Sequence, residues 1–133
     1  MFNVQGMELA MSDGKNSQPK FDLGNRLEEF GVLIVGIAEK MPNTRAGSYI
    51  STQLIRSGLS PIFNYGEAQS AESRNDFVHK LKIVTKELRE TKAAFKLTYR
   101  LGLLKDDSVT TSIKESDELI AIFVKSIETA KEE

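Results

Sequence analysis

The most strongly patterned stretch of the sequence is residues 73–102, SRNDFVHKLKIVTKELRETKAAFKLTYRLG. Ser73 and Asp76 stand three residues apart at its start, which is close to the spacing of a helix-capping box. Large apolar residues then recur at helical spacing, and the face that we expect to pack inside the bundle is made of Phe77, Leu81, Val84, Leu88, Phe95 and Tyr99. Gly102 is a residue type that often follows the last turn of a helix. The pattern predicts a helix of about 28 residues, roughly 42 Å long at 1.5 Å per residue.

Three more helices are expected on either side of this stretch. The first covers residues 22–40, where apolar residues again follow a four-three spacing. The second follows Thr44, a good N-cap, and continues towards residue 70 with a kink near Pro61. The last begins at residue 107 or 108 and continues to about residue 130.

These four segments alternate with short connections, and no strand or hairpin pattern competes with them. We therefore predict an all-α, antiparallel up-and-down four-helix bundle formed by residues 21–133. Residues 1–20 contain Gly, Pro, Ser and Asn without a sustained period, so we expect them to form a flexible N-terminal arm.

Composition excludes several classes of function. The chain has 133 residues, no cysteine and a formal net charge of −1, so disulfides and thiolate metal sites are ruled out. The longest uncharged apolar run, residues 30–38, is half of the roughly 18 residues that a membrane span requires. We expect a cytoplasmic protein without a membrane partner.

No catalytic constellation stands out either. His79 is the one histidine, and no glycine-framed serine or Glu-x-x-His motif accompanies it, so an ordinary structural role is expected. Phosphate-binding and dinucleotide-binding loops are absent. The sequence therefore predicts a non-enzymatic protein without metal, cofactor or small-molecule substrate.

The helix over residues 73–102 carries more than one patterned face when it is turned at 100° per residue. Opposite its core face lies a basic stripe made of Lys82, Lys86, Arg89, Lys96 and Arg100. Between the two lies a second apolar strip made of Ile83, Ala94, Leu97 and Leu101. The strip suggests either a contact with another subunit or a wider contact inside the bundle.

Charge is also segregated along the chain. Residues 21–105 contain 13 basic and 9 acidic residues, a net of +4, whereas residues 106–133 contain 3 basic and 8 acidic residues, a net of −5. A phosphate backbone or an acidic protein surface could dock on the basic stripe, although a solvated helix face is the default for such a pattern. Because no aromatic residues are interleaved with the stripe, sequence-specific reading of single strands is not expected.

The second predicted helix carries a polar stripe at three- and four-residue intervals. Its candidate members are Gln53, Arg56, Ser60, Asn64 and Glu67. Such a stripe is either solvated surface or a buried hydrogen-bonded network, and if Arg56 and Glu67 are buried they need partners on another helix or chain. Glu87 and Glu90 are expected to form surface ion pairs with nearby lysines.

Three runs of this region resemble one protein family. They are QLIRSGLS at 53–60, NYGEA at 64–68 and AESRNDFVHKL at 71–81, with later matches at Lys86-Glu87, Glu90-Thr91 and Gly102-Leu103-Leu104. They are similar to the bacterial four-helix bundle proteins related to the rRNA intervening-sequence protein, and the likeness covers about residues 21–125.

The resemblance implies an all-helical bundle that assembles into a ring-like homopentamer and has no known catalytic activity. Some relatives are encoded inside insertions of large-subunit rRNA genes. Others are similar to the accessory variability determinant of diversity-generating retroelements, which binds nucleic acid and a reverse transcriptase. We therefore expect an oligomeric accessory or scaffold protein that contacts RNA or DNA; the alternative is a protein–protein interaction module with no role in nucleic-acid binding.

Overall fold

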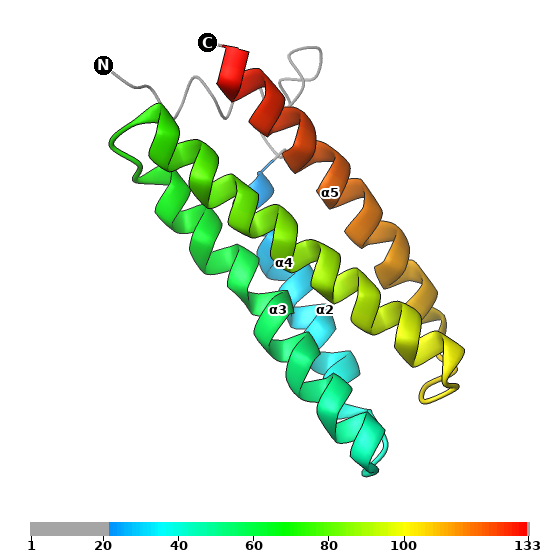
Figure 1. The fold of residues 1–133 in the computed structure, drawn as a ribbon. Helices are drawn as coiled ribbons and strands as arrows, with labels where there is room; N and C mark the ends of the chain where they lie inside the picture. Colours follow the sequence, from blue (N-terminus) through cyan, green and yellow to red (C-terminus); the bar gives the residue numbers. More distant parts are fainter. Residues whose placement is uncertain (1–21, 133) are drawn as a thin grey trace.

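The computed structural model describes residues 22–132, and this part of the chain folds into four helices without any strand (Figure 1). They are α2 (Leu23–Glu39), α3 (Arg45–Gln69), α4 (Arg74–Arg100) and α5 (Asp107–Glu132). The predicted four-helix bundle is confirmed. The N-terminal arm that we expected at residues 1–20 lies outside the described residues.

Local capping explains why the predicted helix ends were accurate to within a residue or two. Asp22, Thr44 and Ser73 each accept a hydrogen bond from a backbone N–H three residues ahead, at 3.0–3.1 Å. These side chains satisfy donors that the first helical turn leaves without a partner. After α4, Gly102 adopts a positive φ of 65°, which explains why glycine suits this turn.

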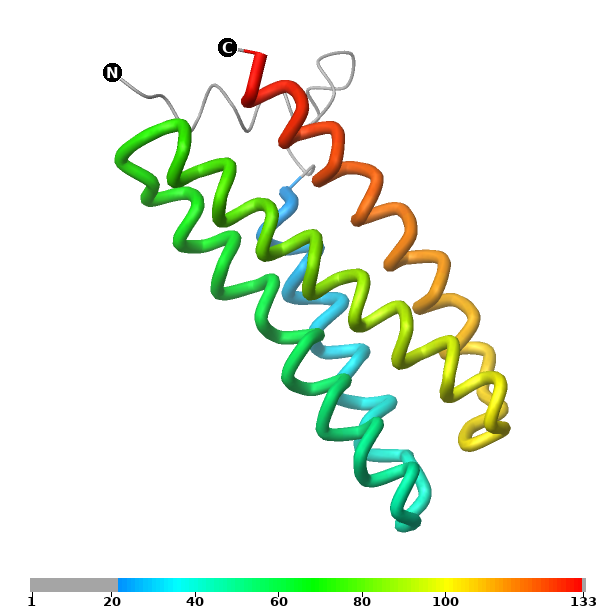
Figure 2. Tube along the Cα trace, in the orientation of Figure 1, coloured from blue at the N-terminus to red at the C-terminus, as the bar shows by residue number. Residues whose placement is uncertain are grey.

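The helices form an antiparallel bundle in which α4 lies between α3 and α5 (Figure 2). Helix α2 lies behind α3 and α4 in this view, packs mainly on α3 and touches α5 less extensively. Because α4 is flanked on two sides and faces the core with a third, only one side of it is left to face solvent. None of the described helices combines the length and the apolar content that crossing a membrane requires.

The core is built from the apolar faces that the sequence pattern indicated. Phe77, Leu81, Leu88 and Phe95 of α4 are completely buried. The ring of Phe95 packs against Phe30 of α2 with centroids 6.4 Å apart. Burial of such side chains contributes roughly 1.5–3 kcal/mol each before the entropy of ordering is counted, so α4 is the central element of the fold.

Helix α3 continues unbroken through Pro61, which lies buried inside it. One turn earlier, Gly58 allows α2 to approach closely, because a Cβ at this position would lie 2.7 Å from Cδ1 and 2.8 Å from Cγ2 of Ile34. Glycine at position 58 is therefore explained by packing between α2 and α3 rather than by a turn.

Candidate nucleic-acid interface

The basic stripe follows the outward side of α4. Its five residues recur at spacings of four, three, seven and four, and they fall within about 80° around the helix axis. All five are exposed. Within residues 22–132, none of them takes part in an ion pair.

Two other cations of the same helix behave differently. Lys80 lies 2.6 Å from a carboxylate oxygen of Glu67 on α3, and Lys92 lies 2.6 Å from a carboxylate oxygen of Asp117 on α5. The hydrogen bond from Lys80 to Glu67 raises the pKa of Lys80. The cations that face neighbouring helices are thus paired, whereas those that face solvent keep their charge available.

The polar stripe of α3 lies along its seam with α4, and of the two alternatives it is closer to a solvated surface than to a buried network. The side chain of Arg56 is 48% exposed and that of Glu67 is largely exposed as well. Gln53, Ser60 and Asn64 are half-buried. The seam lies at the rim of the bundle, where long side chains can reach water while their stems cover the core.

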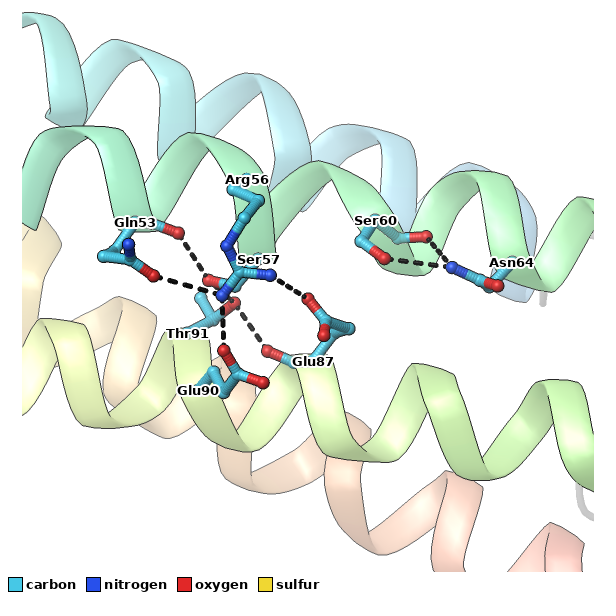
Figure 3. Close-up of polar contacts among 8 residues, drawn as sticks. All are labelled: Gln53, Arg56, Ser57, Ser60, Asn64, Glu87, Glu90 and Thr91. Atoms are coloured by element: carbon cyan, nitrogen blue, oxygen red, sulfur yellow. Dashed lines mark hydrogen bonds and ion pairs between the residues drawn. The ribbon is translucent and has the colours of Figure 1, made fainter.

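The charged group that is buried at this seam is Glu87, which we had expected at the surface. Its side chain is 7% exposed, and its Oε2 accepts a hydrogen bond of 3.0 Å from Nη1 of Arg56. Arg56 also donates to Gln53 and Glu90 (Figure 3), and its bond to Glu90 is the main cause of its raised pKa. Arg56 thus links the two helices through two carboxylates of α4.

Hydroxyl and amide groups complete the seam. Beside Arg56, the hydroxyl of Thr91 on α4 donates a hydrogen bond of 2.9 Å to the hydroxyl of Ser57 on α3, and both residues are buried. The amide of Asn64 donates to the hydroxyl and the carbonyl oxygen of Ser60 within α3 (Figure 3). Polar groups at this seam therefore have partners, which removes the cost of burying them alone.

The second apolar strip of α4 is only partly exposed. Ala94 is 7% exposed and belongs to the core of the subunit, and Ile83 is half-buried. Leu97 and Leu101 have about half of their surface open to solvent. The strip therefore divides into an inner part that widens the bundle contact and an outer part near the end of α4.

The exposure of three aromatic residues was not predicted from the sequence. Tyr99, expected on the core face of α4, is exposed. Tyr49 and Phe63 of α3 are exposed too. They lie seven residues before and seven residues after Arg56, so Tyr49, Arg56 and Phe63 share one outward line along α3. That heptad spacing was a usable signal, but the sequence did not reveal which side of α3 its neighbours leave open.

The surroundings of the histidine do not form a catalytic or metal-binding site within residues 22–132. His79 is exposed, and within residues 22–132 no three His, Asp or Glu side chains are placed to hold a metal ion. The described part of the chain is thus an all-α, antiparallel four-helix bundle protein whose central helix presents unpaired cations.

Comparison with known proteins identifies the family. Residues 20–125 match the model of the 23S rRNA-intervening sequence protein family, and the chain belongs to this family. A solved protein of unknown function from the S23 ribosomal protein family of Bacteroides thetaiotaomicron has the same fold. It is 30% identical, with a TM-score of 0.74 over 80% of this chain and 98% of that one. No curated protein matches.

Proposed function

We propose that this protein is a non-enzymatic, oligomeric bundle that acts as an accessory or scaffold by binding the phosphate backbone of RNA or DNA. Lys82, Lys86, Arg89, Lys96 and Arg100 would contact the phosphates. The observation that carries the proposal is that these five exposed cations share one face and have no acidic partner within residues 22–132.

The length of the stripe suits a nucleic-acid backbone. From Lys82 to Arg100 the helix rises about 27 Å at 1.5 Å per residue, a distance over which a duplex presents many phosphates. Contacts of this kind release counterions but read no bases, so binding is expected to be independent of sequence.

Assembly of several copies would strengthen such binding, because each added subunit repeats the stripe on one particle. Leu97 and Leu101 at the end of α4, together with Tyr49 of α3, are the exposed apolar residues that we assign to the contact between copies. Together with the family resemblance, this supports a ring of five subunits. We propose the cytoplasm as its location.

A salt titration tests the proposal directly. If all five cations contact phosphates of a duplex, the logarithm of affinity should fall with the logarithm of salt concentration with a slope of about −4.5. A variant with the five residues changed to Glu should lose binding to duplex DNA and to RNA in a filter assay. Its circular dichroism spectrum should stay unchanged, because all five side chains are exposed.

A matched control changes five other cations to Glu: Arg45, Lys105, Lys114, Lys125 and Lys131. All five are exposed, and no ion pair of residues 22–132 includes them. Equal binding by the stripe variant and the wild type overturns the nucleic-acid role, as does an equal loss in the control. A partner protein that stays bound to the wild type after nuclease treatment, but does not bind the stripe variant, would instead support the protein-interaction alternative.

A further inference from the structure

A shallow groove lies between α2 and α3, away from α4 and its basic stripe. Along α2, Glu28, Val32, Val35 and Glu39 stand at spacings of four, three and four, so they form one line along the helix. Val32 is 76% exposed. The groove is lined by Glu28, Gly31, Val32, Val35, Leu59 and Ile62.

The apolar surface continues from this groove onto α3. Ile62 also lines a neighbouring hollow together with Phe63 and Gly66, and the rest of its lining is Glu67 and Ser70 beside Asp76 and Lys80 of α4. Phe63 is 66% exposed, although burying an aromatic ring of this size is strongly favourable. The apolar surface therefore runs from Val32 across Ile62 to Phe63, and within the described residues nothing covers it.

The charges along this surface are mostly acidic, since Lys80, the one lysine that lines the hollow, is paired with Glu67, and Asp76 lies beside it. Glu28 and Glu39 of α2 are exposed, and neither of them takes part in an ion pair within residues 22–132. The residues that line the groove include Glu28 but no lysine or arginine. A ligand that covers this surface should therefore bring positive charge together with apolar side chains.

Two glycines beside this surface have no packing explanation within residues 22–132. A Cβ at Gly36 of α2 or at Gly66 of α3 would meet no atom within 4 Å, and both residues are exposed inside helices. Glycine destabilises a helix interior relative to alanine, so a neighbour that needs the space is expected. Such a neighbour would come from outside the described residues.

We propose that the α2–α3 groove docks a basic amphipathic helix of another protein chain. From Glu28 to Glu39 the line on α2 is about 16 Å long, which matches about three turns of a helix. Leucine-like residues on one face of the partner would cover Val32, Ile62 and Phe63, and its flanking lysines or arginines would meet the carboxylates. The proposal does not depend on nucleic-acid binding, because it uses different residues on a different side of the bundle.

Two peptides of equal composition test the groove. One is a 14-residue helical peptide of leucine and lysine with its leucines on one face, and the other is a scrambled version without an apolar face. We expect the amphipathic peptide to bind the full chain at least about tenfold more tightly in fluorescence anisotropy. Equal binding of the two peptides, or binding of neither, overturns the proposal.

Variants then locate the binding surface. The double substitutions Val32→Ser with Phe63→Ser, and Glu28→Gln with Glu39→Gln, should each weaken binding of the amphipathic peptide by about tenfold. The control Glu128→Gln with Glu132→Gln, which changes two exposed carboxylates of α5, should leave it unchanged. An equal loss in the control contradicts the proposal. Light scattering of the Val32→Ser, Phe63→Ser variant without peptide gives a second check. A particle mass below that of the wild type also contradicts the proposal, because it would show that the groove binds a second copy of the chain.

Discussion

Nη1 of Arg56 on α3 lies 3.0 Å from Oε2 of Glu87 on α4, yet only the carboxylate of this pair is buried. The guanidinium of Arg56 remains half exposed to water. Because the carboxylate of Glu87 is buried, removal of Arg56 would leave a buried charge without its partner. Glu90, which binds the same guanidinium, is more exposed than Glu87 and can be solvated without it. The two carboxylates of α4 therefore depend on Arg56 to different degrees.

We predict that Arg56→Ala lowers the free energy of unfolding by about 1–3 kcal/mol, because it leaves the carboxylate of Glu87 desolvated and unpaired. The matched variant Glu90→Ala should lower it by less than about 1 kcal/mol, as expected for an exposed ion pair. Urea denaturation of both variants measures the difference. Equal effects of the two substitutions would show that burial of Glu87 does not matter.

A pair of glycine substitutions on α3 should act in opposite directions. Gly58→Ala places a Cβ against Ile34 of α2, and overpacking of this kind typically costs about 1–3 kcal/mol. Gly66→Ala meets open space and should instead stabilise the helix by up to about 1 kcal/mol. Thermal unfolding should show a lower Tm for the first variant and a higher Tm for the second. A higher Tm for Gly58→Ala would contradict the close contact between the two helices.

Asp106 lies directly before α5, and its lowered pKa predicts that the free energy of unfolding depends on pH. Its Oδ1 accepts a hydrogen bond of 3.0 Å from the backbone N–H of Ser108, which is the main cause of its lowered pKa. A lowered carboxyl pKa stabilises the fold above the ordinary pKa of aspartate, about 3.9, and this contribution is lost as the pH falls through the lowered value.

Replacement of Asp106 should therefore matter only while its carboxylate is charged. We expect the difference in unfolding free energy between the wild type and Asp106→Ala to be present at pH 7 and to shrink by about pH 2. Urea titrations at both pH values measure it. A difference that stays constant with pH would show that the carboxylate does not stabilise this turn through its charge.

Two lysines of α4 offer a sharp comparison for nucleic-acid binding. Lys86 is exposed and unpaired within residues 22–132, whereas Lys92 is held by Asp117. Lys86→Gln should reduce the salt slope of binding by about 1, as expected when one phosphate contact is lost. Lys92→Gln should change it much less. The same reduction for both would mean that the net charge of the chain, rather than the basic stripe, controls binding.

Much of the bundle was predictable because the relevant signals are local. Asp22, Thr44 and Ser73 act on backbone groups three residues away, so a cap can be recognised from a few neighbouring letters. The core face of α4 followed from the 3.6-residue period for the same reason. The five cations of the basic stripe were also assigned to one side of α4, because residues at helical spacing share a face whatever lies around the helix.

The environment of each flank was not predictable in this way. Residues on the sides of a helix are buried or exposed according to how the neighbouring helices pack against it, and that packing joins residues far apart in the chain. Glu87 was expected at the surface and is buried, whereas Tyr99 was expected in the core and is exposed. Helical periodicity thus established the four amphipathic helices and the basic stripe. Packing between the helices set which polar groups became buried and which apolar side chains stayed open, because these depend on contacts across the bundle.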